Sequence, residues 1–311
     1  MLVNLLSRKS FFAEIILGVL FFILFLWKNT PFSTDWIDNL GIISFAATIL
    51  LSSVLIFNQN LIKYPGFGIW FLMIWMFPFA DIAFEPRIST SLFFVTLIFW
   101  RLLATEQSME NKKFFFDIGI LLSISGFFYP PSLLLAGFLI FIFFYVQSFN
   151  IKSFLLFFIG FTLPLVVGIQ LLFLTDQLAW LETYYSAFCI DFWNYSLWSL
   201  IPIGLFILVC WFDHLSNSNT QDINKRHKYF LTFLYFINLL IILIVFGGEF
   251  YSLLAFLGLP IAIFFTRFVQ YQSSKILQEI ILWAFLVCMM GFYFRVEIME
   301  FYQDLLGNVS F

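Results

Sequence analysis

Long apolar runs alternate with short polar segments along almost the whole chain. Most runs are continuous and lack the strict alternation of a barrel strand, so they predict helices. A helix also pairs its own backbone groups, as hydrocarbon requires. We expect about eleven transmembrane helices, at residues 11–27, 41–57, 66–80, 90–105, 114–128, 132–148, 154–175, 196–212, 229–246, 251–268 and 276–294. Several have only about 15 residues, against the ~20 that cross a bilayer of ~30 Å.

The composition supports a membrane interior rather than a soluble core. Of 311 residues, 62% are hydrophobic and 11% are charged, whereas a soluble domain is about half apolar and about a quarter charged. The expected fold is therefore an all-α polytopic bundle that occupies residues 1–311 as one membrane domain. Residues 1–212 would hold eight helices and 213–228 a polar cytoplasmic loop, and 229–311 would hold three helices and a short external tail.

The basic residues orient this map. With the amino terminus in the cytoplasm, every Lys and Arg lies on the cytoplasmic side except Lys28, Arg87 and Arg295. The positive-inside rule predicts such a bias, so we expect a cytoplasmic amino terminus and an external carboxyl terminus. A net charge of −3 without a dense basic stripe argues against nucleic acid as a partner.

Metal and cofactor chemistry has little support. Cys189, Cys210 and Cys288 are widely separated, and both histidines, His214 and His227, fall in the polar loop. A zinc site, a haem or a disulfide framework is therefore not expected, and no cofactor is predicted.

The first external loop contains a candidate catalytic pair. Asp35 and Asp38 lie three residues apart and would share a face on one helical turn. A carboxylate facing a membrane-embedded cavity suits a general base that deprotonates a sugar hydroxyl. The alternative is a solvated loop in which Asp38 caps the second helix.

Two further external turns contain candidate binding residues. Asp81, Glu85 and Arg87 lie within seven residues, and Arg87 is suited to a lipid-linked phosphate. Arg87 is equally suited to Glu85 or to a phospholipid headgroup. Tyr129 lies in the turn FFYPPS and is expected at the external mouth of the bundle; a simple tight loop explains this turn as well.

The external segment 176–195 has the pattern of an amphipathic helix. Its apolar residues recur at steps of three or four, and tryptophans flank them. We expect a helix lying in the membrane interface.

Two resemblances add expectations about function. Residues 100–138, from WRLLATEQ to PPSLLLAGF with the pair Phe116-Asp117 between them, resemble an uncharacterised family of bacterial inner-membrane proteins. The architecture resembles the glycosyltransferase C superfamily, which transfers sugars from polyprenyl-phosphate donors at the external face. That resemblance implies Asp35 or Asp38 as base and Arg87 as phosphate contact. The scarcity of external cations and the absence of a large external domain depart from it.

Two hypotheses remain open from the sequence. One is a glycosyltransferase C-like enzyme that uses a polyprenyl-phosphate sugar at the external face. The other is a non-catalytic membrane subunit that scaffolds an envelope complex, with membrane lipid and other envelope proteins as partners. A transporter ranks below both, because ionisable residues at mid-membrane depth are nearly absent from the predicted spans.

Overall fold

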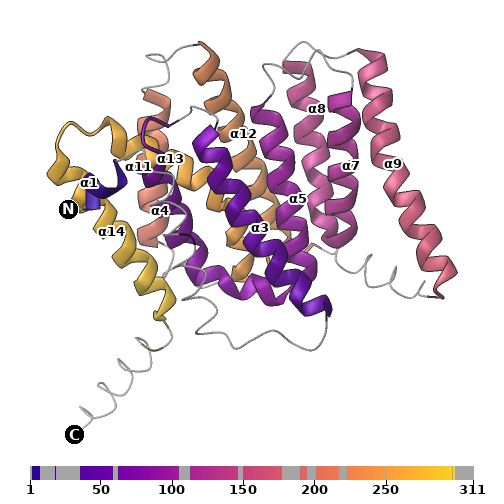
Figure 1. The fold of residues 1–311 in the computed structure, drawn as a ribbon, viewed down its shortest axis with the longest axis horizontal. Coiled ribbons are helices and arrows are strands. Elements are labelled where there is room, and N and C mark those ends of the chain that lie inside the picture. The colour runs from indigo at the N-terminus through magenta and orange to yellow at the C-terminus, as the bar shows by residue number, and fades with distance from the viewer. Residues whose placement is uncertain are drawn as a thin grey trace, which may run out of the picture.

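The protein is a bundle of helices standing side by side (Figure 1). The computed structural model describes residues 2–7, 18, 36–58, 62–104, 113–145, 150–176, 190–194, 201–216, 223–248, 250–295 and 297. No strand occurs among these residues, which confirms the all-α class. The helices are α1 (Leu2–Leu6), α3 (Trp36–Asn58), α4 (Pro65–Met76), η1 (Phe77–Phe84), α5 (Pro86–Leu103), α7 (Lys113–Phe128), η2 (Pro130–Leu134), α8 (Leu135–Tyr145), α9 (Ile151–Leu174), α11 (Ile201–Ser216), α12 (Ile223–Phe246), η5 (Tyr251–Leu257), α13 (Gly258–Tyr271) and α14 (Lys275–Tyr293).

The described residues include seven helical stretches long and apolar enough to cross a membrane. They are Asn39–Phe57, Pro65–Phe84, Pro86–Leu103, Ile151–Leu174, Lys225–Phe246, Tyr251–Tyr271 and Lys275–Tyr293. Two shorter apolar helices accompany them, at Pro130–Phe144 and Ile201–Asp213. The chain is therefore a multi-pass membrane protein. Each predicted span from 41–57 onward overlaps a helix, whereas 11–27 lies outside the described residues apart from Gly18, so the total of eleven stays a prediction.

Short 3₁₀ helices lengthen two of the spans. α4 ends at Met76, and the chain continues as η1, which contains Pro78. In the second span the order is reversed, because the 3₁₀ helix η5 comes first and continues directly into α13. A 3₁₀ helix rises ~2.0 Å per residue, against ~1.5 Å for an α-helix. The predicted 15-residue span at 66–80 thus becomes a 20-residue helical stretch.

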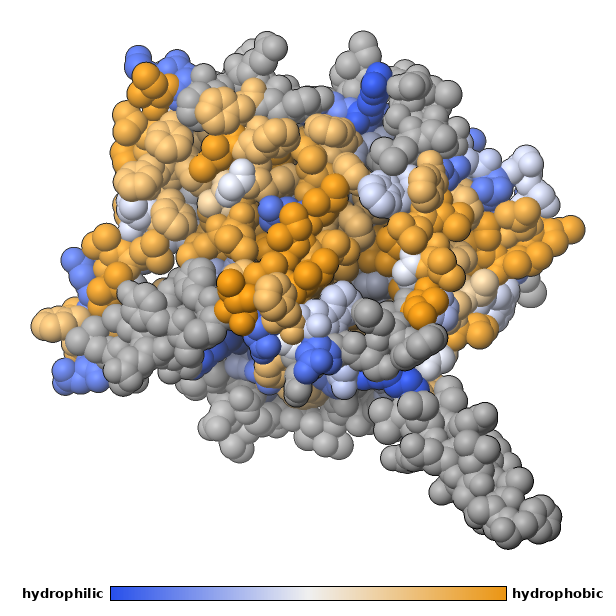
Figure 2. Space-filling model, turned by 180° about the vertical axis from the view of Figure 1, so that it is seen from behind, coloured by the Kyte–Doolittle hydropathy of each residue, from blue (hydrophilic) through white to orange (hydrophobic). Residues whose placement is uncertain are grey.

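The two ends of the bundle differ in charge. One end, uppermost in Figure 1, is where α7, α9, α12 and α14 begin; we call it the basic end. The other, which we call the acidic end, is where α3 and α5 begin. Basic residues at the basic end are Lys63, Arg101, Lys113, Lys152, Lys225, Arg226, Lys228, Arg267 and Lys275, with the acidic Asp117, Asp213 and Glu279. Acidic residues at the acidic end are Asp81, Glu85, Asp176, Asp191 and Glu297, with the basic Arg87 and Arg295. Figure 2 shows a broad hydrophobic band between hydrophilic upper and lower edges, as a lipid-facing surface requires.

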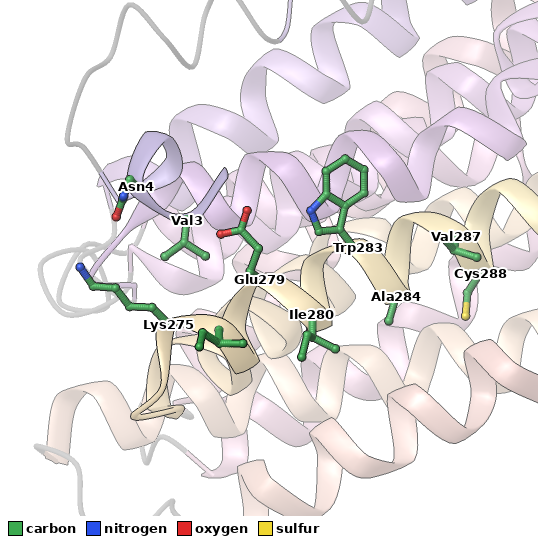
Figure 3. Close-up of a pocket in the computed structure, with 10 residues that line it drawn as sticks. Val3, Asn4, Lys275, Glu279, Ile280, Trp283, Ala284, Val287 and Cys288 are labelled. Atoms are coloured by element: carbon green, nitrogen blue, oxygen red, sulfur yellow. The ribbon is translucent and has the colours of Figure 1, made fainter. Parts of the chain in front are cut away.

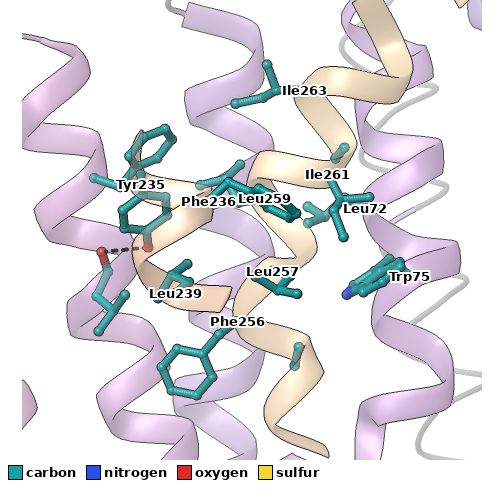
Figure 4. Packing of buried hydrophobic residues seen from close by; sticks show 14 of the residues in the cluster. Leu72, Trp75, Tyr235, Phe236, Leu239, Phe256, Leu257, Leu259, Ile261 and Ile263 are labelled. Atoms are coloured by element: carbon teal, nitrogen blue, oxygen red, sulfur yellow. Dashed lines mark hydrogen bonds between the residues drawn. The ribbon is translucent and has the colours of Figure 1, made fainter. Parts of the chain in front are cut away.

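Aromatic side chains fill the interior where α4, α12 and α13 meet (Figure 4). Tyr235 is 1% exposed, stacks on Phe99 with ring centroids 4.2 Å apart, and donates a hydrogen bond to the Val95 carbonyl at 3.3 Å. Trp75 is 2% exposed, and its indole N–H donates to the Leu254 carbonyl at 2.9 Å. The Tyr235 hydroxyl and the Trp75 indole thus each reach a backbone acceptor on a neighbouring helix, which stabilises them in an apolar interior.

Two glycines allow α7 and α9 to cross at close range. A Cβ atom on Gly119 would overlap the Phe157 carbonyl oxygen, and a Cβ on Gly160 would overlap the Phe116 carbonyl oxygen. Small residues at a helix crossing let two backbones approach each other in a membrane. α9 makes its main contact with α7, and few of its residues are buried. Figure 1 shows it at one edge of the bundle.

Two predicted boundaries need correction. The polar loop 213–228 is shorter than expected, because α11 continues to Ser216 and α12 begins at Ile223. The interfacial helix 176–195 is wrong at its carboxyl end. Residues 190–194 are not helical, and the remainder, 177–189 and 195, lies outside the described residues.

Residues 190–194, which we call the strap, attach to the end of α12 by backbone hydrogen bonds. Asp191 N–H donates to the Val245 carbonyl at 3.1 Å, and Gly248 N–H donates to the Asp191 carbonyl at 3.0 Å. Trp193 N–H donates to the Ile244 carbonyl at 3.0 Å. The last carbonyls of a helix have no partner within it. The strap therefore satisfies carbonyls that a helical segment 190–194 would have left exposed.

Candidate functional site

Four of the predicted external positions, Asp38, Asp81, Glu85 and Arg87, lie where α3, η1 and α5 pack together, a place we call the α3–α5 corner. Asp38 lies in the first turn of α3, and Arg87 in the first turn of α5. These two helix starts are adjacent, because the Ser89 hydroxyl donates to the Gly41 carbonyl at 2.7 Å. η1, which carries Asp81, packs against both helices.

The corner is closed one turn below its surface. A Cβ on Gly41 would lie 2.5 Å from the Ala83 carbonyl oxygen and 2.9 Å from Pro86 Cα, so only glycine fits. Ser44 and Thr90 hydroxyls then meet at 3.2 Å in the buried layer beneath. The two helices are in contact here rather than separated by a cavity.

The charged side chains of the corner lie on its surface. Asp81, Glu85 and Arg87 are all exposed. Glu85 occupies the N-cap of α5, but its side chain accepts no capping hydrogen bond. Asp35 and the side chain of Asp38 lie outside the described residues. The structure thus brings four of the predicted positions, Asp38, Asp81, Glu85 and Arg87, to neighbouring helix ends.

Tyr129 lies apart from the corner and is not at an open mouth. Its ring is half-buried beside Phe256, with centroids 6.0 Å apart, and its hydroxyl donates to the Phe246 carbonyl at 3.5 Å. It borders an internal cavity of about 10 Å³, the size of one water molecule at most. Desolvation by burial raises the pKa of the Tyr129 hydroxyl, which therefore stays a proton donor. Its position fits a packing role better than a substrate contact.

A buried chain of hydroxyls escaped the sequence reasoning. Ser125 in α7 shares a hydrogen bond with Ser91 in α5 at 2.8 Å and donates to Ser132 in η2 at 2.9 Å. All three are at most 2% exposed. Serine is common where membrane helices pack together. The serines in residues 87–91 (RISTS) and 123–126 (SISG) therefore did not predict a hydrogen-bonded chain. Because these bonds join three helical segments next to the corner, they fix its position relative to the α7–η2 turn.

Replacing Ser125 with alanine should loosen this junction. The variant removes the shared donor and acceptor and leaves Ser91 and Ser132 without their common partner. Hydrogen bonds between membrane helices contribute about 0.6–1.7 kcal/mol, so we expect a loss of unfolding free energy of that order. Thermal unfolding in detergent measures it. The control is Thr162→Ala in α9, whose hydroxyl donates to the Phe158 and Ile159 carbonyls of its own helix; an equal loss in both variants would contradict the junction.

The basic end has an ion pair between α5 and α7. Arg101 in α5 donates to the Asp117 carboxylate in α7, and both side chains are partly exposed. They border an open pocket of about 470 Å³ whose remaining lining is apolar, with Leu97, Trp100 and Leu121 among it. The ion pair between Arg101 and Asp117 joins α5 to α7 near the ends of both helices. This structural role accounts for the two charges.

A longer groove runs between α1 and α14 from the basic end (Figure 3). Its volume is about 790 Å³. Asn4, Lys275 and Glu279 gather at one end, and Trp283, Val287 and Cys288 continue along α14. This groove was not predictable from the sequence, because α1 is a five-residue helix too short to show a periodic pattern.

The described residues contain no cluster of three or more His, Cys, Asp or Glu side chains arranged to hold a metal ion. A protein-family model matches residues 1–302 of the chain. No curated protein matches, and no solved structure matches. The glycosyltransferase-like architecture therefore gains no support from a structural relative and stays a prediction.

Proposed function

Because that match covers almost the whole chain, the protein belongs to the family of unknown function DUF6427, and we propose that it serves as a non-catalytic subunit of a membrane complex in the cell envelope. Membership agrees with the uncharacterised family that residues 100–138 resemble. One observation supports this function over the enzyme: the helix ends that carry the predicted catalytic residues are packed against each other.

Transfer of a sugar from a lipid carrier needs a concave site that holds both reactants. At the α3–α5 corner, Gly41 contacts Ala83 and Pro86, and the layer below is filled by paired hydroxyls. Asp81, Glu85 and Arg87 point from a surface rather than into an enclosure. Exposed carboxylates on helix starts compensate the positive helix ends without catalytic consequence. This arrangement is what a structural subunit requires.

The proposal includes an orientation. The basic end faces the cytoplasm and the acidic end faces outward, in a bacterial inner membrane, because nine described cations lie at the basic end and two at the acidic end, as the positive-inside rule expects. The acidic end then presents the α3–α5 corner and the strap to other envelope proteins.

A second candidate, the glycosyltransferase, is favoured by the adjacency of Asp38 and Arg87. Both lie in first turns of parallel neighbouring helices, whose N–H groups favour an anion such as a phosphate. Asp38, or Asp35 outside the described residues, would be the general base, and Arg87 would bind the donor phosphate. Nearby Asp81 and Glu85 oppose the anion by like-charge repulsion.

Replacing the candidate catalytic and phosphate-binding residues distinguishes the two hypotheses. We expect Asp35→Asn, Asp38→Asn and Arg87→Lys, each expressed at native level, to support normal growth and an unchanged envelope-glycan profile in a strain where deletion of the gene has a phenotype. A general base contributes roughly 10²–10⁴-fold in rate. A subunit without a general base has no such rate to lose, so we expect the amide variants to retain its function.

Lys152→Gln, an exposed cation at the opposite end of the bundle, is the matched control. Native electrophoresis of membranes should show the protein in a complex larger than itself, unchanged in the corner variants. Loss of the glycan product in either Asn variant, with expression maintained, would overturn the subunit and establish the enzyme. A protein that migrates alone in native membranes would also contradict the subunit.

A further inference from the structure

We propose that two copies of this protein associate in the membrane through the side of α12 that carries Asn238, and that the two Asn238 amides hydrogen-bond to each other. Such a pair does not depend on the function proposed above, because an enzyme and a structural subunit can form it equally well. It follows from the depth of this amide in the membrane and from its lack of a partner among the described residues.

Asn238 lies close to the middle of a membrane span. The helical stretch Lys225–Phe246 has its midpoint between residues 235 and 236, so Asn238 is within three residues of it, or ~4 Å along a helix. The nearest charged residue of α12 is Lys228, ten residues earlier, at ~15 Å. Water and headgroups are therefore out of reach of a side chain as short as asparagine. A polar group at this depth needs a partner in protein.

The Asn238 amide has no hydrogen bond within the described part of the chain. Its carbonyl oxygen is buried and accepts none. The residue as a whole is only partly buried and its amide nitrogen is not enclosed, so the N–H₂ group reaches the surface of the bundle. The last torsion of asparagine is broad and roughly two-fold, so rotation exchanges the two atoms. The same position can therefore present either a donor or an acceptor.

Asn238 borders the exposed side of α12. Tyr235 and Leu239 point into the interior (Figure 4). Ile241 and Ile244, by contrast, are 49% and 41% exposed. Residues three apart are neighbours on a helix surface, so the amide lies beside Ile241. This side of α12 is therefore an apolar surface with a hydrogen-bonding group at its edge.

The depth of the amide selects the occupant of this surface. Lipid chains reach it but carry no hydrogen-bonding group. Copies of one chain insert in the same orientation, so a two-fold axis along the membrane normal places both Asn238 residues at the same depth. An amide is complementary to itself, because one copy donates an N–H to the carbonyl oxygen of the other. A second copy of this chain therefore supplies the missing partner.

The cations of α12 do not oppose this contact. Arg226 precedes Asn238 by twelve residues, or ~18 Å along the helix, and lies at the basic end. Membrane helices cross at ~20–40°, so two helices in contact near Asn238 diverge toward their ends. The two copies of Arg226 then lie farther apart than the screening length of ~8 Å.

The monomer–dimer equilibrium in lipid tests the pairing. Full-length labelled protein is reconstituted in phosphatidylcholine vesicles over a range of protein-to-lipid ratios, and the dimers are counted by single-molecule photobleaching. Asn238→Leu retains the approximate size of the side chain and removes the hydrogen bond. We expect the dissociation constant of the dimer to rise about three- to twentyfold, as for other hydrogen bonds between membrane helices. Asn238→Gln retains the amide and should retain most of the association.

Two measurements separate the pairing from a role within one copy. Gln170→Leu is the matched control, because Gln170 is an exposed amide on another membrane helix, α9; it should leave the dissociation constant unchanged. The unfolding midpoint of the monomer in dilute detergent should not fall in Asn238→Leu, since this amide has no bond to lose within its own copy. A lower midpoint would show that Asn238 bonds within its own chain, which would overturn the pairing.

Cysteine cross-linking locates the contact. In a chain whose three native cysteines are replaced by alanine, Ile241→Cys should cross-link two copies on mild oxidation. Val166→Cys, which is 52% exposed on α9, should not. Cross-linking through α9 alone would overturn the proposed surface.

Monomers at every protein-to-lipid ratio would also overturn the pairing, and so would an unchanged dissociation constant in Asn238→Leu. A third result would do the same: a purified protein that is monomeric, together with a larger complex in native membranes that Asn238→Leu disrupts. That result would assign this side of α12 to a helix of another protein instead of a second copy.

Discussion

Gly160→Leu is expected to separate α9 from α7 and to lower the unfolding midpoint of the protein by several degrees. The Cβ alone would overlap the Phe116 carbonyl oxygen, which belongs to a helix backbone and cannot rotate away. Overpacking costs about 1–3 kcal/mol where side chains can adjust, and a backbone obstacle places this variant at the upper part of that range or beyond. Thermal unfolding in detergent measures the loss.

The chain contains its own controls for the glycine effect. A Cβ on Gly137 or Gly204 would meet no atom within 4 Å, so Gly137→Leu and Gly204→Leu add the same side chain without a collision. Both should unfold near the wild-type midpoint. Gly119→Leu should reproduce the Gly160 defect from the other side of the crossing, and a normal midpoint in either crossing variant would contradict the close contact.

Trp75→Ala is expected to be the most destabilising single replacement in the interior. It removes a side chain that is 2% exposed, packs on Phe79 with ring centroids 5.4 Å apart, and bonds to the Leu254 carbonyl. Removing a buried tryptophan costs about 3–5 kcal/mol, because packing is lost and a cavity remains. The unfolding free energy in a denaturing detergent titration gives the value.

Trp75→Phe separates the ring from its hydrogen bond. Phenylalanine retains most of the apolar contact and leaves the Leu254 carbonyl without its donor, so we expect a loss of about 1–3 kcal/mol. We therefore expect the unfolding free energy to increase in the order Trp75→Ala, Trp75→Phe, wild type. An alanine variant as stable as the phenylalanine variant would show that the ring is not packed as described.

The transmembrane helices were predictable because lipid imposes one rule on the whole segment. A run such as 229–246 must be apolar and helical regardless of its neighbours, and α12 covers it. No such rule applies to the polar residues that precede this run, so the first residue of the helix could not be predicted from them. Lys225 and Lys228 indicated a loop, yet α12 already begins at Ile223, because a helix can extend past the apolar region where its side chains reach water.

The site and the packing depend on partners distant in sequence. Gly41 and Gly160 look alike in the chain, and so do Gly137 and Gly204, yet only the first two meet another backbone. The adjacency of Asp38 and Arg87 required the Ser89 contact to Gly41, 48 residues apart. In segment 176–195 the apolar spacing favoured a helix, but backbone pairing with α12 determines the conformation of residues 190–194.

The strap also sets an order for synthesis. α9 lies at one edge of the bundle and α11 near the other (Figure 1), and the strap, which comes between them in the sequence, is bonded to the end of α12. Its attachment point, the end of α12, is made about fifty residues later than the strap. Residues 190–194 are therefore synthesised before the Ile244 and Val245 carbonyls that accept their hydrogen bonds. These bonds can form only after α12 has been made. A chain truncated before the end of α12 therefore lacks the carbonyl groups to which the strap is bonded.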